Sequence, residues 1–333
     1  MAGTGTAHLR SSGDVVLRAE GLTVTYASLG RKRHAAIEGL SIDLLAGETL
    51  GIVGESGCGK STAARAVMQL PRPDEGTVGF KGVELTKLRG AAMRSARAGM
   101  QMVLQDPHSS LNPRRTVRQL VGAGLDVWGK ESGPAREALV SEVLHAVGLD
   151  PQTVADRLPH TLSGGQCQRV SIARSLVLRP DVLVCDEPVS ALDVSVQAQI
   201  LNLLEDMKDR YQLSMIFIAH DLAVVKNVSD RIVVLYLGRV CEVGTPDEVF
   251  GDPQHPYTRL LIDSIPVPRP VAVEAAPLGL REPASTSGDA PGCRFRSRCP
   301  QAQELCAVSE PEVRESVEGH FVACHFPSTR GGE

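Results

Sequence analysis

Hydrophobic residues follow a strand-like pattern at the start of the chain. Residues 15–26, 40–45 and 49–53 are short apolar or alternating runs, and turn-forming residues separate the last two. The basic run 31–34 between the first two is expected to be a solvated hairpin tip. From about Asp106 to Pro159 the pattern becomes helical and polar, with apolar residues at helix spacing over 136–149. We expect a mostly β opening followed by an inserted helical subdomain.

Strand-like and helical runs alternate in the next hundred residues. The strand-like runs at 181–187, 213–220 and 230–238 are separated by helical stretches such as 195–208. This alternation is typical of a parallel sheet covered by helices, so the fold class predicted is α/β. Residues 266–292 contain six prolines and no periodicity, which predicts an irregular linker.

Composition excludes several classes of protein. At about 150 residues per domain, 333 residues suggest about two domains. No stretch approaches the roughly 18 apolar residues of a membrane span, and the start of the chain lacks the apolar core of a secretory signal. We therefore expect a cytoplasmic location with reduced or metal-bound thiols. A net charge of −4 and 3% aromatic residues argue against nucleic acid as a partner.

A glycine-rich run directly follows the apolar residues 49–53. It consists of Gly54, Glu55, Ser56, Gly57, Cys58, Gly59, Lys60, Ser61 and Thr62, and a helix-forming stretch comes after it. The run fits GxxxxGK[ST], in which glycines let backbone N–H groups surround phosphate oxygens. Lys60 would reach the β- and γ-phosphates and Ser61 would hold Mg²⁺. We call residues 54–62 the phosphate loop and predict that it binds a nucleoside triphosphate.

Two carboxylates end the apolar run 182–187. Asp186 and Glu187 should lie at the carboxyl edge of the parallel sheet, where open α/β sheets bind their ligands. Asp186 would act on Mg²⁺ through its water shell, and Glu187 would polarise the attacking water as general base. A lone strand-end carboxylate is commonly just solvated, but the phosphate loop favours the functional interpretation.

A third motif precedes a helical pattern. It consists of Leu162, Ser163, Gly164, Gly165 and Gln166, and we call it the LSGGQ loop. Ser163 is the expected helix N-cap, and the helix start would expose backbone N–H groups to an anion. Taken alone, this motif is more often an ordinary capped helix.

In this order and with these separations, the three motifs resemble the nucleotide-binding domain of an ATP-binding cassette (ABC) transporter over roughly residues 15–250. The resemblance implies a P-loop cassette with a RecA-like parallel-sheet core, an N-terminal antiparallel β subdomain and a helical subdomain at about residues 106–165. It extends to Gln105 as the Q-loop, to the D-loop that ends at Asp193, and to His220 as the switch histidine. Tyr26 resembles the aromatic residue that stacks on adenine.

The resemblance also implies cofactors and roles. ATP and Mg²⁺ would bind, with Ser61, Gln105 and Asp186 as metal ligands. Glu187, His220 and Gln105 would support hydrolysis. Members of this family pair head to tail, so that the LSGGQ loop of one chain closes on the ATP held by the phosphate loop of the other. Cys167 departs from the arginine or lysine that the family usually has after this motif, although it removes no phosphate ligand.

Three further stretches, 106–117, 193–208 and 254–268, resemble the oligopeptide/dipeptide importer ATPases, and among them the second of two paired subunits. This resemblance implies a heterodimer with a sister ABC ATPase, two transmembrane permease subunits docked near residues 105–116, and an extracytoplasmic solute-binding protein. The chain would then lie peripherally on the cytoplasmic face of the cell (inner) membrane. Importers of nickel or other small solutes share this type of ATPase, so the cargo stays open.

Two other classes compete with a transport ATPase. Repair ATPases insert a long coiled coil between the phosphate loop and the LSGGQ loop, whereas here Lys60 and Ser163 are only 103 positions apart. ABC proteins of translation usually join two cassettes in one chain, and this chain has a single set of motifs. A regulatory subunit that does not hydrolyse ATP would lack part of the set.

The C-terminal residues 293–326 contain a separate motif of four cysteines. Cys293, Cys299, Cys306 and Cys324 satisfy the ligand count of an iron–sulfur cluster or a structural zinc, but their spacing is not the usual zinc spacing. His320 and His325 keep a mixed zinc site open, and unliganded thiols are the remaining alternative. The segment resembles the C-terminal extension of the peptide-importer ATPases, which implies a [4Fe–4S] cluster. We therefore divide the chain into an ATPase domain at 15–250, a helix with a proline-rich linker at 251–292, and a four-cysteine domain at 293–326.

Overall fold

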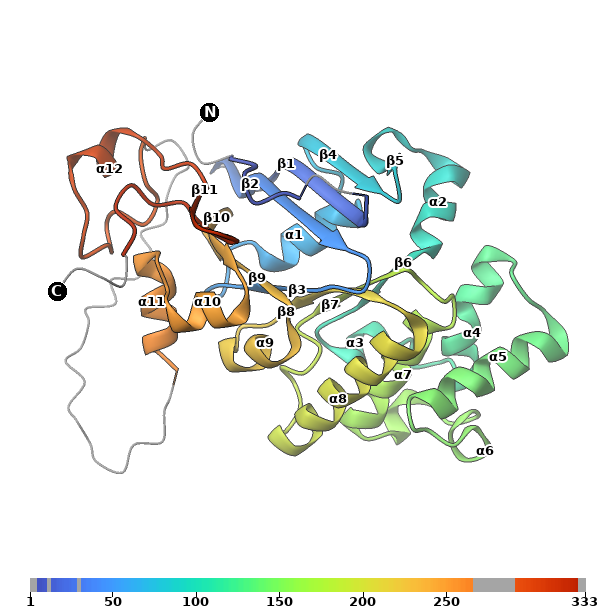
Figure 1. Cartoon of the computed structure of the whole chain (residues 1–333). Coiled ribbons are helices and arrows are strands. Elements are labelled where there is room, and N and C mark those ends of the chain that lie inside the picture. The colour runs from blue at the N-terminus through green and yellow to red at the C-terminus, as the bar shows by residue number, and fades with distance from the viewer. Residues whose placement is uncertain (1–4, 11–12, 29–30, 266–290, 329–333) are drawn as a thin grey trace, which may run out of the picture.

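The computed structural model describes residues 5–10, 13–28, 31–265 and 291–328 as an α/β fold with two β-sheets. Figure 1 shows the smaller sheet lying above the larger one, with helix α1 (Lys60–Val67) between them. Helices α7 (Gly164–Leu176), α8 (Val194–Tyr211) and α9 (Leu222–Val228) cover the other face of the larger sheet. The expected α/β cassette architecture is confirmed.

The smaller sheet is antiparallel, in the order β2-β1-β4-β5. Its strands are β1 (Val15–Ser28), β2 (Arg31–Leu45), β4 (Glu75–Phe80) and β5 (Val83–Glu84). The basic run 31–34 is part of β2, because the antiparallel pairing with β1 continues through Tyr26↔His34 and Ser28↔Arg31. The expectation that this run forms the hairpin tip was therefore wrong.

The larger sheet has the order β11-β12-β10-β9-β3-β8-β7-β6. Its strands are β3 (Thr49–Val53), β6 (Met100–Val103), β7 (Val182–Asp186), β8 (Ser214–Ile218), β9 (Arg231–Tyr236), β10 (Arg239–Gly244), β11 (Arg314–Val317) and β12 (His320–Val322). The pairings from β9 through β6 are parallel. Every residue of β3, β7 and β8 is buried, as expected for parallel strands covered on both faces.

The remaining helices lie in three regions. Beside the sheets are α2 (Gly90–Ala98) and the 3-10 helix η1 (Leu85–Lys87). The helical region on the right of Figure 1 contains α4 (Val117–Trp128), α5 (Gly133–Ala146) and α6 (Pro151–Val154). Along the chain, α3 (Pro107–Ser110) precedes this region and the 3-10 helix η2 (Pro159–Thr161) follows it. The left side carries α10 (Pro246–Gly251), α11 (Pro256–Asp263) and α12 (Glu304–Val308).

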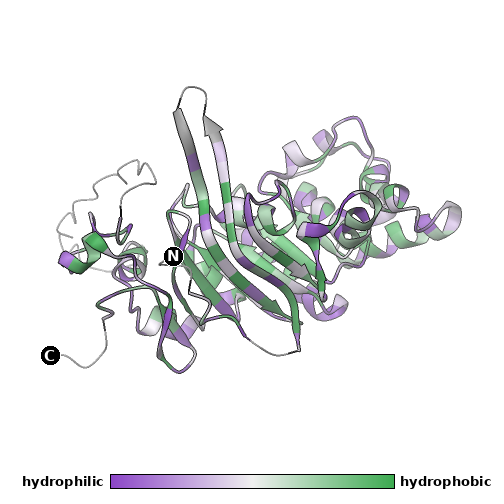
Figure 2. Ribbon diagram, turned by 90° about the horizontal axis from the view of Figure 1, so that it is seen from above, coloured by the Kyte–Doolittle hydropathy of each residue, from purple (hydrophilic) through white to green (hydrophobic). Residues whose placement is uncertain are grey.

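The core has two parts, one on each face of the larger sheet. Val182 and Val184 of β7 pack with the smaller sheet and α1, whereas Leu183 and Cys185 of the same strand pack with the helices on the opposite face. Alternate side chains of a strand point to opposite faces, so one strand supplies both parts. Figure 2 shows apolar residues concentrated along the strands at the centre of the molecule.

The C-terminal region is joined to the larger sheet. Strand β12 pairs with β10 through Glu242↔Val322 and Val243↔Phe321, and β11 pairs with β12. Glu242 is buried and accepts hydrogen bonds from the N–H groups of Gln254 (2.8 Å) and His255 (2.9 Å). Strand pairing and this carboxylate therefore fix α11 and β12 to the cassette. Most of the predicted proline-rich linker, residues 266–290, lies outside the described residues.

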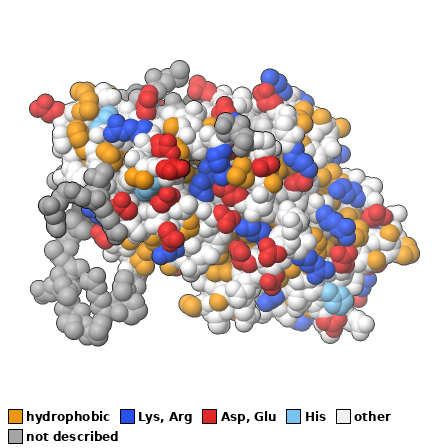
Figure 3. All heavy atoms as spheres, in the orientation of Figure 1, with side chains coloured by type: hydrophobic (Ala, Val, Ile, Leu, Met, Phe, Trp, Pro, Cys, Tyr) orange, Lys and Arg blue, Asp and Glu red, His pale blue; other side chains and the backbone are white. Residues whose placement is uncertain are grey.

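The surface carries both signs of charge. Figure 3 shows acidic and basic side chains interspersed over one face of the molecule. Within the described ranges, no helix combines the length and the apolar character that crossing a bilayer requires.

Candidate functional site

The phosphate loop connects β3 to α1, as its strand–loop–helix pattern predicts. Gly54 and Gly59 have φ angles of +152° and +106°. A Cβ atom on Gly54 would lie 2.2 Å from the carbonyl oxygen of Leu235, and one on Gly59 would lie 2.4 Å from that of Ala36. Both positions therefore require glycine, because backbone of β9 and β2 closes on the loop from outside.

Lys60 lies inside the loop that precedes it. Its side chain is buried, and Nζ donates hydrogen bonds to the carbonyl oxygens of Gly54 (2.7 Å) and Glu55 (2.9 Å). Cys58 is buried as well, and burial raises the pKa of its thiol. Ser56 and Gly57 are exposed at the loop's tip, and Thr62 is half-buried in the first turn of α1. The loop thus presents its tip to solvent above a buried cation.

Ser61 and Asp186 form a pair of oxygen ligands. Ser61 Oγ donates to Asp186 Oδ1 at 2.7 Å, across from the end of β7. Burial raises the pKa of Asp186, and the Ser61 hydrogen bond partly offsets this. Asp186 Oδ2 is buried and has no hydrogen-bond partner within the described part of the chain, although Arg65 lies 3.7 Å away. Hydroxyl and carboxylate oxygens are what Mg²⁺ prefers, so this pair fits the metal that the family implies.

Glu187 follows Asp186 and is the centre of a polar cluster. Its φ of +49° is unusual for a residue with a side chain, and its N–H donates to the carbonyl oxygen of Ile218 at 3.0 Å. Gln105 Nε2 donates to Glu187 Oε2 at 2.8 Å, and His220 Nδ1 lies 3.6 Å from the same oxygen. Segments separated by more than 80 residues therefore converge on this carboxylate.

The LSGGQ loop begins α7. Ser163 and Gln166 form a capping box, because each side chain bonds to the other's backbone N–H. A Cβ atom on Gly165 would lie 2.9 Å from Val196 Cγ1, and one on Gly164 would lie 3.6 Å from Leu192. This loop is therefore packed against the start of α8.

Asp193 caps α8 and accepts hydrogen bonds from Ser195 Oγ (2.7 Å) and the N–H of Val196 (2.9 Å). The Ser195 bond is the main reason that its pKa lies below the usual value.

Two sets of predicted residues stay apart. Among the described residues, no hydrogen bond or ion pair joins the LSGGQ loop or Asp193 to the phosphate loop of the same chain. Tyr26 lies on β1 with 45% of its surface exposed and pairs with His34 of β2. The structure thus brings together Lys60, Ser61, Gln105, Asp186, Glu187 and His220. Among the described residues, the LSGGQ loop makes no hydrogen bond or ion pair with this group.

Sequence reasoning missed the contacts that hold Glu55. Its N–H donates to Tyr257 Oη at 2.8 Å, and its carboxylate forms a bidentate ion pair with Arg298, with both distances 2.8 Å. Arg298 directly precedes Cys299 in the tail, far along the chain from the phosphate loop. No local signal could have paired it with a residue 243 positions away.

The four tail cysteines line one cavity. Cys293 and Cys299 lie in the segment before α12, Cys306 lies in α12, and Cys324 follows β12. Burial, together with the three other thiols, raises the pKa of Cys324 to about 11. Over the described residues, no group of three or more histidine, cysteine, aspartate or glutamate side chains is arranged to hold a metal ion. His320 hydrogen-bonds Glu242 at 2.7 Å and His325 hydrogen-bonds the carbonyl oxygen of Ser309 at 2.8 Å.

Comparison with known families agrees with this geometry. The ABC transporter family model matches residues 37–190, which include the phosphate loop, the LSGGQ loop and both carboxylates. The model of the oligopeptide/dipeptide transporter C-terminal region matches residues 241–306, which include Tyr257 and Arg298.

Several similar proteins are transport proteins. The chain is 45% identical over 296 residues to the oligopeptide transport ATP-binding protein AppF of Bacillus subtilis, covering 88% of this chain and 90% of that protein. It is 47% identical over 296 residues to the oligopeptide transport ATP-binding protein OppF of Escherichia coli, covering 88% of each.

Solved structures show the same fold. The ATP-binding cassette MJ0796, a dimer bound to ADP and phosphate, is 29% identical with a TM-score of 0.63, covering 69% of this chain and 98% of that one. CbiO1 of Clostridium perfringens, part of an ABC transporter complex, is 31% identical with a TM-score of 0.63, covering 72% and 92%. The chain therefore belongs to the ABC transporter family, as an ATPase related to the oligopeptide transport ATP-binding proteins.

Proposed function

We propose that this chain is the ATP-hydrolysing subunit of an importer of oligopeptides or dipeptides. The observation that carries the proposal is the Glu187 cluster: a carboxylate bonded to Gln105, close to His220, and adjacent in sequence to the Asp186–Ser61 pair. The names of AppF and OppF supply the class of cargo. Importers of nickel or other small solutes are the alternative within the same type of ATPase.

In this proposal the phosphate loop holds the triphosphate. Backbone N–H groups of residues 54–62 and the start of α1 surround the β- and γ-phosphates, and Lys60 moves from its loop carbonyls to their oxygens. Ser61, Gln105 and Asp186 would hold Mg²⁺, which neutralises charge on the phosphates. Tyr26, exposed on β1, would stack on adenine.

Glu187 acts as general base toward the attacking water. Its carboxylate is only 16% exposed and is oriented by Gln105, so it meets the water in a fixed position. His220 is 61% exposed and stands beside the same oxygen, where it can contact the γ-phosphate. Because Gln105 begins the connection into the helical region, the γ-phosphate can affect that region through this contact.

We infer that two cassettes share each ATP. The LSGGQ loop is a capped and partly exposed helix start, and among the described residues no hydrogen bond joins it to its own phosphate loop. Ser163, Gly164, Gly165, Gln166 and Asp193 would therefore act on ATP held by a partner, expected to be a sister ABC ATPase. Two transmembrane permease subunits would dock near residues 105–116, together with an extracytoplasmic solute-binding protein, and the chain would lie peripherally on the cytoplasmic face of the inner membrane.

A purification from detergent-solubilised membranes tests this proposal. The tagged chain should bring down a sister ATPase and permeases, and peptide should stimulate its ATPase activity in proteoliposomes that contain the complete system. Glu187→Gln should retain ATP binding and lose hydrolysis by about 100-fold or more, whereas Lys60→Ala should lose binding. Stimulation by nickel and not by peptide would show that the chain belongs to a nickel importer. Recovery with ribosomes or DNA would contradict a transport function.

We also propose that the four tail cysteines hold a [4Fe–4S] cluster. The support is that all four thiols line one cavity although they come from two segments of the chain. An iron–sulfur cluster binds each thiolate to a different iron atom, so its ligands need not converge as they do on a single ion. Its role here would be structural, because it would tie the segment 293–306 to Cys324 beside β12.

Anaerobic purification with metal analysis tests the cluster. We expect brown protein with about four iron and four sulfide per chain, both lost in Cys299→Ser. Colourless protein with stoichiometric zinc would favour the zinc alternative, and protein free of both metals would leave the thiols unliganded.

A further inference from the structure

The phosphate loop is held from outside by the C-terminal region. Glu55 receives two contacts from it: Tyr257 of α11 accepts the hydrogen bond of its N–H, and Arg298 binds both carboxylate oxygens. These partners lie 202 and 243 positions further along the chain. We call this set, Glu55 with Tyr257 and Arg298, the clasp.

Arg298 is held in place by aromatic rings as well as by Glu55. Its side chain is 6% exposed, and the guanidinium carbon lies 5.8 Å from the centre of the Tyr236 ring and 5.7 Å from that of Phe295. The rings of Tyr236, Tyr257 and Phe295 pack on one another with centres 4.6–5.5 Å apart. A planar guanidinium stacked on aromatic rings and paired with a carboxylate at two points has a geometry that lysine cannot reproduce.

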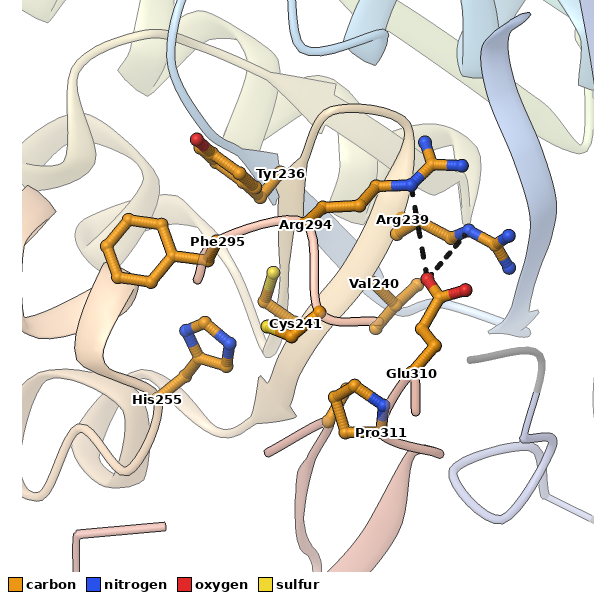
Figure 4. A pocket seen from close by; sticks show the side chains of 11 residues that line it. Tyr236, Arg239, Val240, Cys241, His255, Arg294, Phe295, Glu310 and Pro311 are labelled. Carbon is orange, nitrogen blue, oxygen red and sulfur yellow. Dashed lines mark ion pairs between the residues drawn. The ribbon is translucent and has the colours of Figure 1, made fainter. Parts of the chain in front are cut away.

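The loop that carries Arg298 is anchored separately. Figure 4 shows Arg294 and Arg239 directed at the carboxylate of Glu310, at 4.0 and 3.1 Å, beside Tyr236 and Phe295. Both arginines also pair with Glu38 of β2. The same loop is therefore bound to the smaller sheet at Arg294 and to the phosphate loop at Arg298, so it spans two parts of the cassette.

The clasp controls the groups that hold Lys60. Lys60 Nζ binds the carbonyl oxygens of Gly54 and Glu55, and the clasp fixes the N–H and the side chain of that same Glu55. Gly54 is restrained on its other side by the carbonyl of Leu235. Both residues whose carbonyl groups bind Lys60 are therefore restrained, Gly54 by β9 and Glu55 by the C-terminal region.

We propose that Arg298 and Tyr257 are positioning residues for ATP binding, which hold Glu55 so that the phosphate loop and Lys60 keep their phosphate-binding geometry. This inference rests on the proposed binding of ATP at residues 54–62. Because the clasp acts on the loop and not on Glu187, it governs nucleotide affinity and leaves the chemical step nearly unchanged.

Equilibrium binding of a non-hydrolysable ATP analogue with Mg²⁺, measured on the full chain, tests the clasp. Arg298→Ala should raise Kd about threefold to tenfold, and Arg298→Lys should restore part of the loss. Tyr257→Phe should raise Kd about twofold to threefold. ATPase assays of the assembled transporter should show KM rising with Kd, while kcat changes by less than about twofold. Arg259→Ala, which removes an exposed arginine of α11 that hydrogen-bonds the backbone carbonyl of Pro253, is the matched control.

Glu55→Gln separates the clasp from damage to the tail, because it removes the ion pair from the loop side. It should weaken binding as Arg298→Ala does, and the double variant should be no weaker than either single one. Equal affinity in Arg298→Ala, Glu55→Gln and the control would overturn the clasp. Failure of the unmodified chain to bind the analogue would instead contradict the proposed function.

Discussion

At the scale of single residues, two glycines of the phosphate loop have the same kind of backbone and different surroundings. Gly57 and Gly59 both have positive φ, +78° and +106°. A Cβ atom on Gly57 would meet nothing within 4 Å, whereas one on Gly59 would lie 2.4 Å from the carbonyl of Ala36 and 2.9 Å from Ile37 Cγ2. Gly59 therefore carries a steric requirement in addition to a conformational one.

This difference predicts different effects of alanine. Gly57→Ala should lower the free energy of unfolding by about 1 kcal/mol, the conformational cost of a left-handed alanine. Gly59→Ala should cost about 3 kcal/mol or more, because strand β2 must also move, and it should abolish nucleotide binding. Urea unfolding and analogue binding measure both quantities. Equal losses in the two variants would show that contact with β2 has no effect.

Residue-scale prediction from sequence depends on how local the contact is. Gly54 to Thr62 could be recognised because nine consecutive residues carry the pattern. Ser61 and Asp186 could be linked through the family resemblance although they are 125 positions apart. Glu55 and Arg298 could not, because each is a common surface residue type and only the tertiary fold brings them together.

At the scale of elements, α7 and α4 begin with the same device. Ser163 with Gln166 and Thr116 with Gln119 are both capping boxes. Only the α7 start belongs to the LSGGQ loop. The two helices therefore allow the stabilising effect of a cap to be separated from an effect on ATP.

Alanine at the two caps should give equal stability losses and unequal activity losses. Ser163→Ala and Thr116→Ala should each lower the free energy of unfolding by about 1 kcal/mol. In the paired ATPase subunits assayed without permeases, Ser163→Ala alone should reduce ATPase activity by tenfold or more, because it also removes a proposed phosphate contact across the partner interface. The permeases are left out because Thr116 lies in the proposed docking segment. Similar activities of the two variants would remove Ser163 from the shared site.

Most elements could be predicted from periodicity, and the exceptions have physical causes. Strands β3, β7, β8 and β9 were expected because buried parallel strands are continuous apolar runs. The run 31–34 was misassigned, since a polar sequence can continue an antiparallel ribbon when its partner strand supplies the hydrogen bonds. The pairing of β12 with β10 could not be predicted, because a three-residue strand so far along the chain carries no register information.

At the scale of the whole molecule, one buried carboxylate joins the two sheets. Asp43 of β2 is fully buried and accepts hydrogen bonds from Arg231 of β9 at 2.6 Å and from the backbone N–H of Arg10 at 2.8 Å. Burial alone would raise the pKa of Asp43, but the two arginines outweigh it and hold the pKa below its usual value. The ionised carboxylate therefore stabilises the junction of the sheets.

Asp43→Asn should lower the free energy of unfolding by about 3 kcal/mol near neutral pH, because Arg231 and the half-buried Arg10 each lose one of two carboxylate partners and keep Glu48. A lowered folded-state pKa contributes stability above the unfolded value of about 4, and this is lost as pH falls through the folded-state pKa. The difference between the two proteins should accordingly shrink in acid. Urea titrations from pH 7 to about pH 3 measure it, and a difference that grows in acid would contradict this account.

The long sequence separation within the clasp also has a consequence in time. A ribosome that adds about 5–20 residues per second makes Arg298 roughly 10–50 s after Glu55, since 243 positions separate them. During that interval the phosphate loop of the nascent chain lacks the clasp and should bind nucleotide more weakly. Full affinity therefore requires the C-terminal region, and a chain released before Arg298 is made should bind nucleotide about threefold to tenfold more weakly than the whole chain.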